Sequence, residues 1–155
     1  MTGTRILAVS GCPALAPLVA GWLVEAFHRQ PGDMTVEAMT ALILAPPRGA
    51  EESFVLFEGD RPVGTASLAH DDLPSRPDLT PWLAGVFVLP DCRGRGHASA
   101  LVRHVEGAAR AASIAGLWLY TRTAERLYAG LGWERVGLER DKGREVVLMR
   151  RRLDL

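Results

Sequence analysis

The stretch that decides the fold reads Pro90-Asp-Cys-Arg-Gly-Arg-Gly-His-Ala98. It follows the continuous apolar run 82–89, which is typical of a central buried strand, and it precedes a segment with apolar residues at helical spacing. A glycine-bearing turn therefore leaves a strand and opens a helix. The first N–H groups of a helix have no partner inside it and carry partial positive charge, so they form an anion site. We predict that a diphosphate fits this turn.

Two better-known phosphate motifs do not match the turn. A P-loop would need a Gly-Lys-Ser or Gly-Lys-Thr ending, and a dinucleotide fingerprint would need a third glycine at the right offset from Gly94 and Gly96. These two glycines still allow the close approach that a pyrophosphate needs, and Arg93 and Arg95 add positive charge. Taken alone, a signal of six residues is weak, and the turn can also be read as a basic, solvated helix start.

Outward from the turn, the chain alternates between extended and helical spacing. We expect strands over 4–9, 54–57, 63–68, 82–89, 117–121, 133–139 and 145–150, and helices over about 13–31, 33–46, 96–112 and 124–131. Asp33 is expected to cap the second helix. The order β-α-α-β-β-β-α-β-α-β-β predicts an α/β fold (an α+β mixed sheet) of about 6–7 strands with about four helices on both faces. Its central strand-helix-strand unit should be parallel.

Some charged residues are expected on the surface. On the helix over 96–112, the apolar face leaves Arg103, His104, Glu106 and Arg110 pointing toward water. The run 150–152, three arginines, is expected to be the solvated end of an edge strand.

Size and composition limit the classes of protein. The 155 residues are enough for one domain, 1–155, and too few for two ordinary ones. The 18 basic and 18 acidic residues cancel, so no overall charge favours nucleic acid or a membrane surface as a partner. Cys12 and Cys92 lack the spacing of a metal or redox motif, and we expect free thiols. With no secretory signal and no long apolar run, we expect a cytoplasmic protein.

The turn and its flanks resemble the GNAT superfamily of N-acetyltransferases. Arg93, Gly96 and Ala98 match the family signature Arg/Gln-x-x-Gly-x-Gly/Ala. The segments 86–90, 99–102, 117–120 and 124–133 are similar to the family's successive motifs at suitable spacing. The resemblance covers roughly residues 53–150 as an acetyl-CoA-binding core, while 1–50 fits the family's variable, acceptor-side helices.

The resemblance implies a site and a cosubstrate, acetyl-CoA, with no metal. The pyrophosphate would be held by backbone N–H groups of the turn, those of Arg93, Gly94, Arg95, Gly96, His97 and Ala98. A bulge at Gly85 would separate two strands, the backbone of Val86, Phe87 and Val88 would pair with the pantetheine arm, and the N–H of Val86 would polarise the thioester carbonyl. Tyr128 matches the tyrosine that protonates the departing thiolate in this family.

The chain departs from the family pattern at the general base. Many members carry a glutamate on one of the two central strands, but 82–89 and 117–121 contain no carboxylate. The base must come from Glu25, His70, Asp71, Asp72 or a chain of water molecules. The asparagine that many relatives have after the second strand is also missing, and Thr121 or Thr123 is a possible substitute.

The leading hypothesis is transfer of acetyl from acetyl-CoA to a primary amine of a small molecule, by direct attack in a ternary complex. Glu25, Asp71 and Asp72 are the candidates for the acceptor side, where carboxylates attract a cationic amine. A protein N-terminus or lysine side chain is the alternative acceptor, and a non-catalytic acyl-CoA-binding module is the alternative class. A homodimer is possible.

Overall fold

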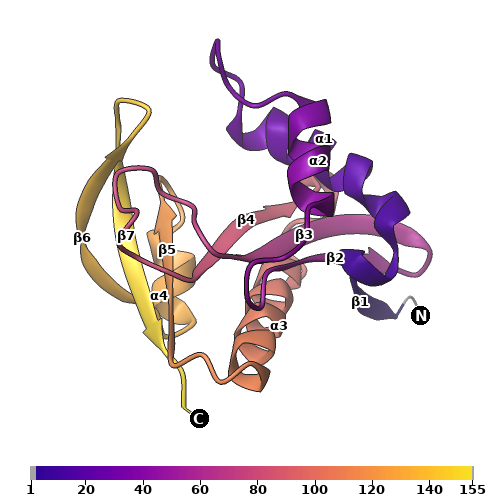
Figure 1. Ribbon diagram of the computed structural model, residues 1–155. Coiled ribbons are helices and arrows are strands. Elements are labelled where there is room, and N and C mark those ends of the chain that lie inside the picture. The colour runs from indigo at the N-terminus through magenta and orange to yellow at the C-terminus, as the bar shows by residue number, and fades with distance from the viewer. Residues whose placement is uncertain (1–2, 155) are drawn as a thin grey trace.

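A seven-stranded sheet, in the order β1-β2-β3-β4-β5-β7-β6, organises the computed structural model, which describes residues 3–154 (Figure 1). Its strands are β1 (Thr4–Ala8), β2 (Glu52–Glu58), β3 (Arg61–Ala69), β4 (Trp82–Val88), β5 (Gly116–Thr121), β6 (Glu134–Asp141) and β7 (Arg144–Arg152). The helices are α1 (Ala16–Phe27), α2 (Val36–Leu44), α3 (His97–Ala111) and α4 (Glu125–Gly130). The predicted order of elements and the mixed sheet are confirmed.

The pairing of the strands is antiparallel except between β4 and β5, which are parallel as predicted. The prediction that the run of arginines ends an edge strand is wrong, because β7 lies between β5 and β6. Its apolar residues Val146, Leu148 and Met149 are buried, and the guanidinium of Arg150 lies over the ring of Trp118, 5.3 Å from the ring centroid.

The N-terminal helices differ from the prediction at their ends. Helix α1 stops at Phe27, before the predicted end at 31. Asp33 does not cap α2, because Thr35 does so by accepting a hydrogen bond from the N–H of Ala38 at 3.1 Å. Asp33 instead accepts from the N–H of Gln30 at 2.9 Å, which closes the loop between the two helices.

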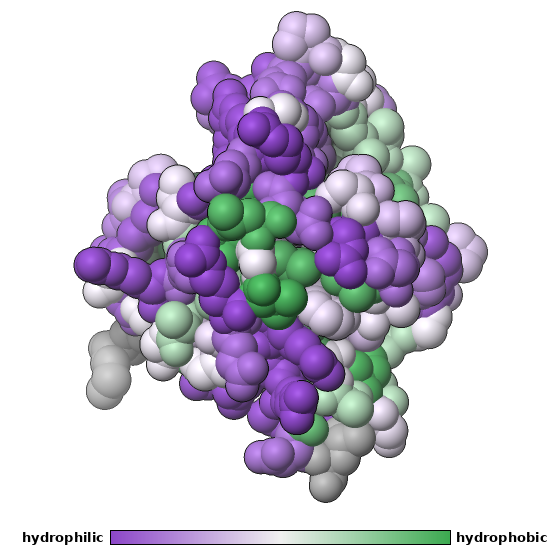
Figure 2. Space-filling model, turned by 90° about the vertical axis from the view of Figure 1, so that its left-hand side faces the viewer, coloured by the Kyte–Doolittle hydropathy of each residue, from purple (hydrophilic) through white to green (hydrophobic). Residues whose placement is uncertain are grey.

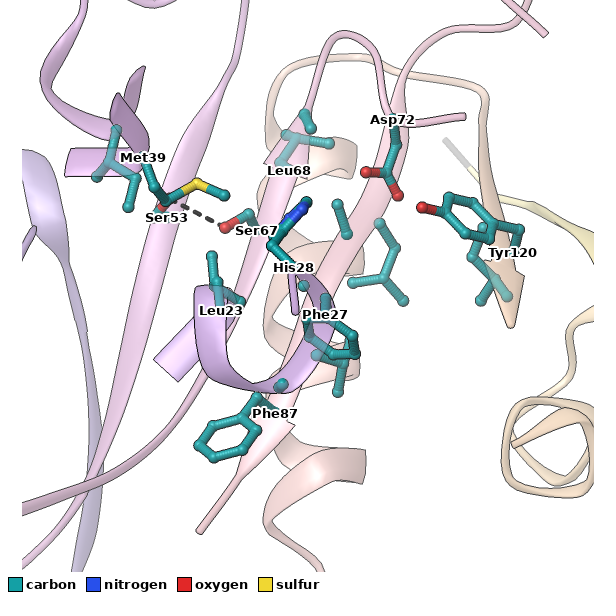
Figure 3. Close-up of a pocket in the computed structure, with 18 of the residues that line it drawn as sticks. Leu23, Phe27, His28, Met39, Ser53, Ser67, Leu68, Asp72, Phe87 and Tyr120 are labelled. Carbon is teal, nitrogen blue, oxygen red and sulfur yellow. Dashed lines mark hydrogen bonds between the residues drawn. The ribbon is translucent and has the colours of Figure 1, made fainter. Parts of the chain in front are cut away.

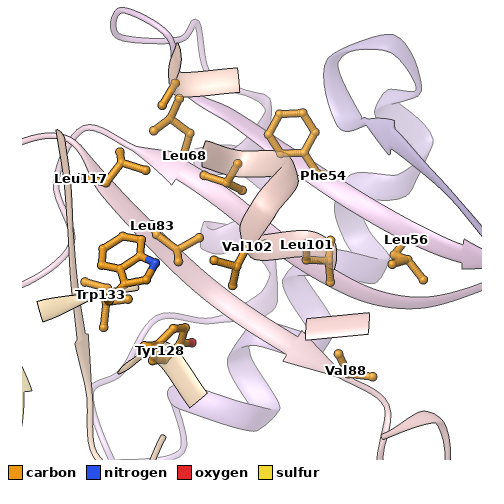
Figure 4. Packing of buried hydrophobic residues seen from close by; sticks show 14 of the residues in the cluster. Phe54, Leu56, Leu68, Leu83, Val88, Leu101, Val102, Leu117, Tyr128 and Trp133 are labelled. Carbon is orange, nitrogen blue, oxygen red and sulfur yellow. The ribbon is translucent and has the colours of Figure 1, made fainter. Parts of the chain in front are cut away.

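Helices cover both faces of the sheet: α1 and α2 lie on one face and α3 on the other (Figure 1). The largest group of buried side chains lies between the sheet and α3, where Leu83, Leu101 and Leu117 are almost fully buried (Figure 4). Tyr128 and Trp133 belong to the same cluster. A smaller cluster on the opposite face packs Trp82 against Leu73, Val146 and Leu148. Burial of this apolar surface is the main force that holds the layers together.

Glu106 corrects a prediction, because it is fully buried and does not face water. Its carboxylate accepts from the indole N–H of Trp133 at 3.0 Å and from Arg103 at 2.9 Å, and the guanidinium of Arg151 lies 3.7 Å away. A buried carboxylate is tolerated only with such partners. The network therefore ties α3 to β7 and to the segment that follows α4.

Strand β6 forms one edge of the sheet and lies outside the core, since none of its residues is buried. Val136 and Leu138 are about half exposed, at 51% each. Figure 2 faces the side on which β6 lies and shows a central apolar patch surrounded by hydrophilic side chains. Among the described residues, no helix is long and apolar enough to cross a membrane.

Candidate active site

Strands β4 and β5 form an opening in the middle of the sheet (Figure 1). Among residues 3–154, their register consists of one pair, Trp82 with Trp118, although both strands continue beyond it. Parallel strands normally stay about 4.8 Å apart along their length. The missing pairs leave backbone groups of β4 available to another molecule.

A β-bulge at Gly85 bends β4 at this opening. Ala84 pairs with Ser67 and Phe87 with Thr65, so Gly85 and the next residue face a single residue of β3. The φ of Gly85 is +60°, a left-handed conformation that favours glycine. The predicted bulge is confirmed.

The side chains of residues 86–88 alternate between the faces of the sheet. Val86 and Val88 pack toward the cluster under α3, whereas the ring of Phe87 lies 5.7 Å from that of Trp22 on α1. Their backbone therefore runs along the edge of the opening. This is the arrangement that strand pairing with a linear amide-bearing ligand requires.

The turn after β4 leads into the uncapped N-terminus of α3. Gly94 and Gly96 both have left-handed φ values, +77° and +81°, and Gly96 is the N-cap residue with no side-chain capping hydrogen bond. The first helical bond is donated by Ala100 to the carbonyl of Gly96 at 3.0 Å. The preceding N–H groups of the first turn thus have no acceptor within the helix, and the binding of a diphosphate there stays a prediction.

The side chains of the turn point elsewhere. Arg93 donates to the carbonyl of Val88 at 3.0 Å, and Arg95 and His97 both contact the carboxylate of Glu58, at 2.8 and 2.6 Å. Hydrogen bonds from Arg95 and then from His97 lower the pKa of Glu58 below its ordinary value. The side chain of His97 is buried, so contact with a phosphate would come from its backbone N–H.

A cleft of about 2630 Å³ joins these features. It extends from the turn before α3, past Val86, to the C-terminal end of α1 and the loop between β3 and β4. Leu23, Phe27 and Met39 supply apolar walls, and Ser53 and Ser67 share a hydrogen bond of 2.9 Å within it (Figure 3). This volume exceeds that of most small-ligand pockets, roughly 300–1000 Å³, so it can hold two substrates together.

Tyr128 lines the cleft from α4. It is 7% exposed, its ring stands edge-on to that of Trp133 with centroids 6.4 Å apart, and burial raises the pKa of its phenol to about 12. The neutral phenol can donate a proton. Thr121, one of the two threonines considered in place of the family's asparagine, accepts from the N–H of Ala124 at 3.0 Å and so fixes the start of α4.

The acceptor-side candidates lie in different places. Glu25 is exposed on α1 at the rim of the cleft, and Asp71 points outward, where it contacts Arg48 at 2.8 Å and His70 at 3.0 Å. Asp72 projects into the cleft toward the phenol of Tyr120 (Figure 3).

Sequence reasoning missed Tyr120, Asp141 and Lys142, which also line the cleft. No local pattern marks them, because strand pairing and a hairpin bring them to the cleft from distant positions. Within residues 3–154, no three His, Cys, Asp or Glu side chains gather as a metal ion would require.

The sequence model of the acetyltransferase (GNAT) family matches residues 19–133. The chain belongs to this family. Several solved structures share the fold of this GNAT protein, although no curated protein matches it. A ribosomal-protein-alanine N-acetyltransferase from Brucella melitensis has a TM-score of 0.76 at 18% identity, over 96% of this chain and 99% of that one.

Two further GNAT structures are similar. The yncA protein from Salmonella typhimurium, solved with its cofactor acetyl-CoA, has a TM-score of 0.71 at 17% identity, over 99% of this chain and 94% of that one. Ard1 from Thermoplasma volcanium has a TM-score of 0.73 at 18% identity, over 98% of this chain and 99% of that one. Family membership makes the chain an acetyltransferase that uses acetyl-CoA, and the uncapped α3 turn and the β4–β5 opening fit that cosubstrate.

Proposed function

We propose that this GNAT protein transfers the acetyl group of acetyl-CoA to a primary amine of a small molecule. The observation that carries the proposal is the opening between β4 and β5, with the uncapped turn of α3 at one end and Tyr128 beside it. Acetyl-CoA supplies the thioester, whose carbonyl carbon the amine attacks. The chain holds the two reactants together, which removes much of the entropic barrier of a bimolecular reaction.

Each site residue has a role in this proposal. The N–H groups from Arg93 to Ala98 hold the pyrophosphate, and the backbone of 86–88 orients the pantetheine arm. The N–H of Val86 stabilises negative charge that develops on the carbonyl oxygen. Tyr128 donates its phenolic proton to the sulfur that leaves, and its raised pKa keeps that proton in place until then.

The proposal of a small acceptor rests on Lys142, which bridges the cleft. Lys142 lies in the turn between β6 and β7, and its ammonium donates to the carbonyl of Phe27 at 3.1 Å and pairs with Asp33 at 3.0 Å. The ammonium also lies 3.2 Å from Nδ1 of His28. Burial and the charge of Lys142 lower the pKa of His28, so that the imidazole is neutral and Nδ1 can accept a hydrogen bond. We call this set of contacts the Lys142 bridge. It joins the end of α1 to the far half of the sheet and restricts that side of the cleft.

A protein N-terminus or a lysine side chain is the second candidate acceptor. The Brucella neighbour acts on a ribosomal-protein alanine, but at 18% identity the likeness is one of fold. The Lys142 bridge crosses the side of the cleft where an extended peptide would lie, so a peptide would have to break three contacts made by Lys142. A small amine leaves the bridge intact.

The test is an acceptor screen that measures release of the CoA thiol. Polyamines, amino sugars and amino acids are compared with peptides that carry a free N-terminus or lysine, and the products are identified by mass. Acetylation of small amines supports the proposal, and acetylation of peptides alone supports the alternative acceptor. If acetyl-CoA raises the melting temperature but no acceptor is acetylated, the protein is a binding module.

A further inference from the structure

Asp72 turns its carboxylate into the cleft, while the side chains of Asp71 and Leu73 beside it are held by other contacts (Figure 3). Asp71 pairs with Arg48 on the outside, and Leu73 is buried among Trp82 and Leu148. These two anchors fix the loop after β3 and turn the carboxylate of Asp72 toward the phenol of Tyr120 (Figure 3).

Tyr120 places this carboxylate at the β4–β5 opening. It lies two residues beyond Trp118, whose pairing with Trp82 is the last before the strands part, and it therefore shares a face of β5 with Trp118. Val86 lies four residues beyond Trp82 on β4. At about 3.3 Å per residue, Val86 therefore lies roughly 7 Å further along the opening than Tyr120.

The two ends of the reaction lie on opposite faces of the sheet. Tyr128 belongs to the core cluster under α3. Tyr120 packs with the cluster of Trp82 and Leu73 on the other face of the sheet. An amine that approaches past Asp72 therefore meets the carbonyl from one side while the sulfur leaves toward Tyr128 on the other. This separation keeps proton removal and proton donation apart.

The charges around Asp72 favour a base that works near neutral pH. Burial, and then the carboxylate of Asp141 at the end of β6, raise the pKa of Asp72 to about 7. Burial and the two carboxylates also raise the pKa of Tyr120, which stays neutral, and Arg122 acts on that phenol in the opposite direction. The ammonium of Lys142 is paired with Asp33. A base with a pKa near the working pH is the most effective one.

We propose that Asp72 is the general base that removes a proton from the acceptor amine, an inference that rests on the proposed function. The acceptor ammonium gives one proton to the Asp72 carboxylate. The free amine nitrogen then forms a bond to the carbonyl carbon, and the bond from that carbon to sulfur breaks. The nitrogen loses its second proton to solvent, Tyr128 protonates the sulfur and recovers a proton from solvent, and Asp72 releases its own proton to solvent. The products are an amide, the CoA thiol and one proton.

The test compares Asp72→Asn with the wild type over a series of acceptors whose ammonium pKa ranges from about 5 to about 10. Asp78→Asn is the matched control, because it makes the same change in the same loop on a carboxylate that pairs with Arg76 away from the cleft. Acetyl-CoA affinity is measured in parallel by calorimetry. Both Asn variants should bind acetyl-CoA as the wild type does.

We expect kcat/KM of the wild type to rise tenfold per pH unit below about 7 and then to level off, and this inflection should disappear in Asp72→Asn. The variant should lose on the order of 100-fold or more with strongly basic amines and little with weakly basic ones, which are already unprotonated. An equal loss with every acceptor, or an unchanged pH profile, would overturn the role of Asp72. A wild type that binds acetyl-CoA but acetylates no amine would instead overturn the proposed function, and this inference with it.

Discussion

Gly85 on β4 lies directly against Leu23 on α1: a Cβ on Gly85 would stand 3.0 Å from Cδ2 of Leu23. The contact presses the bulge of β4 against α1, whose C-terminal part lines the cleft. Since Gly85 also has a φ of +60°, a side chain there meets both steric crowding and an unfavourable backbone conformation.

Gly85→Ala should therefore flatten or displace the bulge. We expect a loss of stability on the order of 1–2 kcal/mol and a larger, at least tenfold, loss in kcat/KM, because the N–H of Val86 would move. Gly107→Ala on α3 is the control, since a Cβ there meets nothing within 4 Å and alanine favours a helix. Denaturation by urea and initial rates measure the two effects. Normal kinetics in Gly85→Ala would show that the bulge is not needed for the reaction.

Gly96→Asp should abolish binding of acetyl-CoA without unfolding the protein. The aspartate places a negative charge at the N-terminus of α3, where the phosphates are expected. A Cβ at position 96 would meet no atom within 4 Å, so the substitution does not disturb the packing. Gly49→Asp has the same kind of left-handed φ, +61°, but lies away from the turn. Acetyl-CoA should raise the melting temperature of the wild type and of Gly49→Asp, but not of Gly96→Asp. A full shift in Gly96→Asp would remove the turn from the binding site.

Tyr128→Phe should lower kcat by roughly 10- to 1000-fold with little change in acetyl-CoA affinity. Phenylalanine keeps the ring and its edge-on packing against Trp133, so the fold should persist. Water can also protonate a thiolate, and a moderate loss is therefore expected. Single-turnover rates report the chemical step directly. If they are unchanged, Tyr128 is only part of the cleft wall.

Asp72→Asn should make the protein more stable at neutral pH, whatever it does to catalysis. The pKa of Asp72 is raised from 3.8 to about 7, so between these values the folded protein binds a proton that the unfolded chain has lost. The contribution of Asp72 to stability therefore falls as pH rises from about 4 to about 7. Relative to the wild type, the variant should gain on the order of 2–4 kcal/mol over this range. Urea denaturation at pH 4.5 and 8 tests the sign, and a constant difference would contradict the raised pKa.

Lys142→Ala should open the side of the cleft that the Lys142 bridge restricts. We expect it to raise KM for small amines several-fold and to admit peptide acceptors, while acetyl-CoA affinity stays the same because the phosphate turn lies elsewhere. Lys142→Arg keeps the charge that pairs with Asp33 and should behave more like the wild type. Rates with one small amine and one peptide, measured on all three proteins, decide whether the bridge controls acceptor size.

The sequence by itself determined the order of the elements and indicated where to look for the cosubstrate end of the site. The turn before α3 and the bulge at Gly85 could be located because each depends on residues within a few positions along the chain: a helix start and a glycine inside a strand. Tyr128 was singled out by the resemblance of its short helix to the GNAT family. Such local preferences act through the backbone and need no knowledge of distant contacts.

The tertiary structure alone decided which side chains come together at the other end of the cleft. Insertion of β7 between β5 and β6 shielded a strand that the sequence placed at the edge, and packing of α3 buried Glu106 beneath Trp133. The carboxylate of Asp72 faces the phenol of Tyr120, which is 48 positions further along the sequence (Figure 3). Lys142 donates a hydrogen bond to the carbonyl of Phe27, which is 115 positions earlier. Contacts of this kind depend on the order of strands in the sheet, which side-chain spacing along one segment does not encode, and so the approach of Asp72 to Tyr120 and the Lys142 bridge emerge only once the layers are assembled.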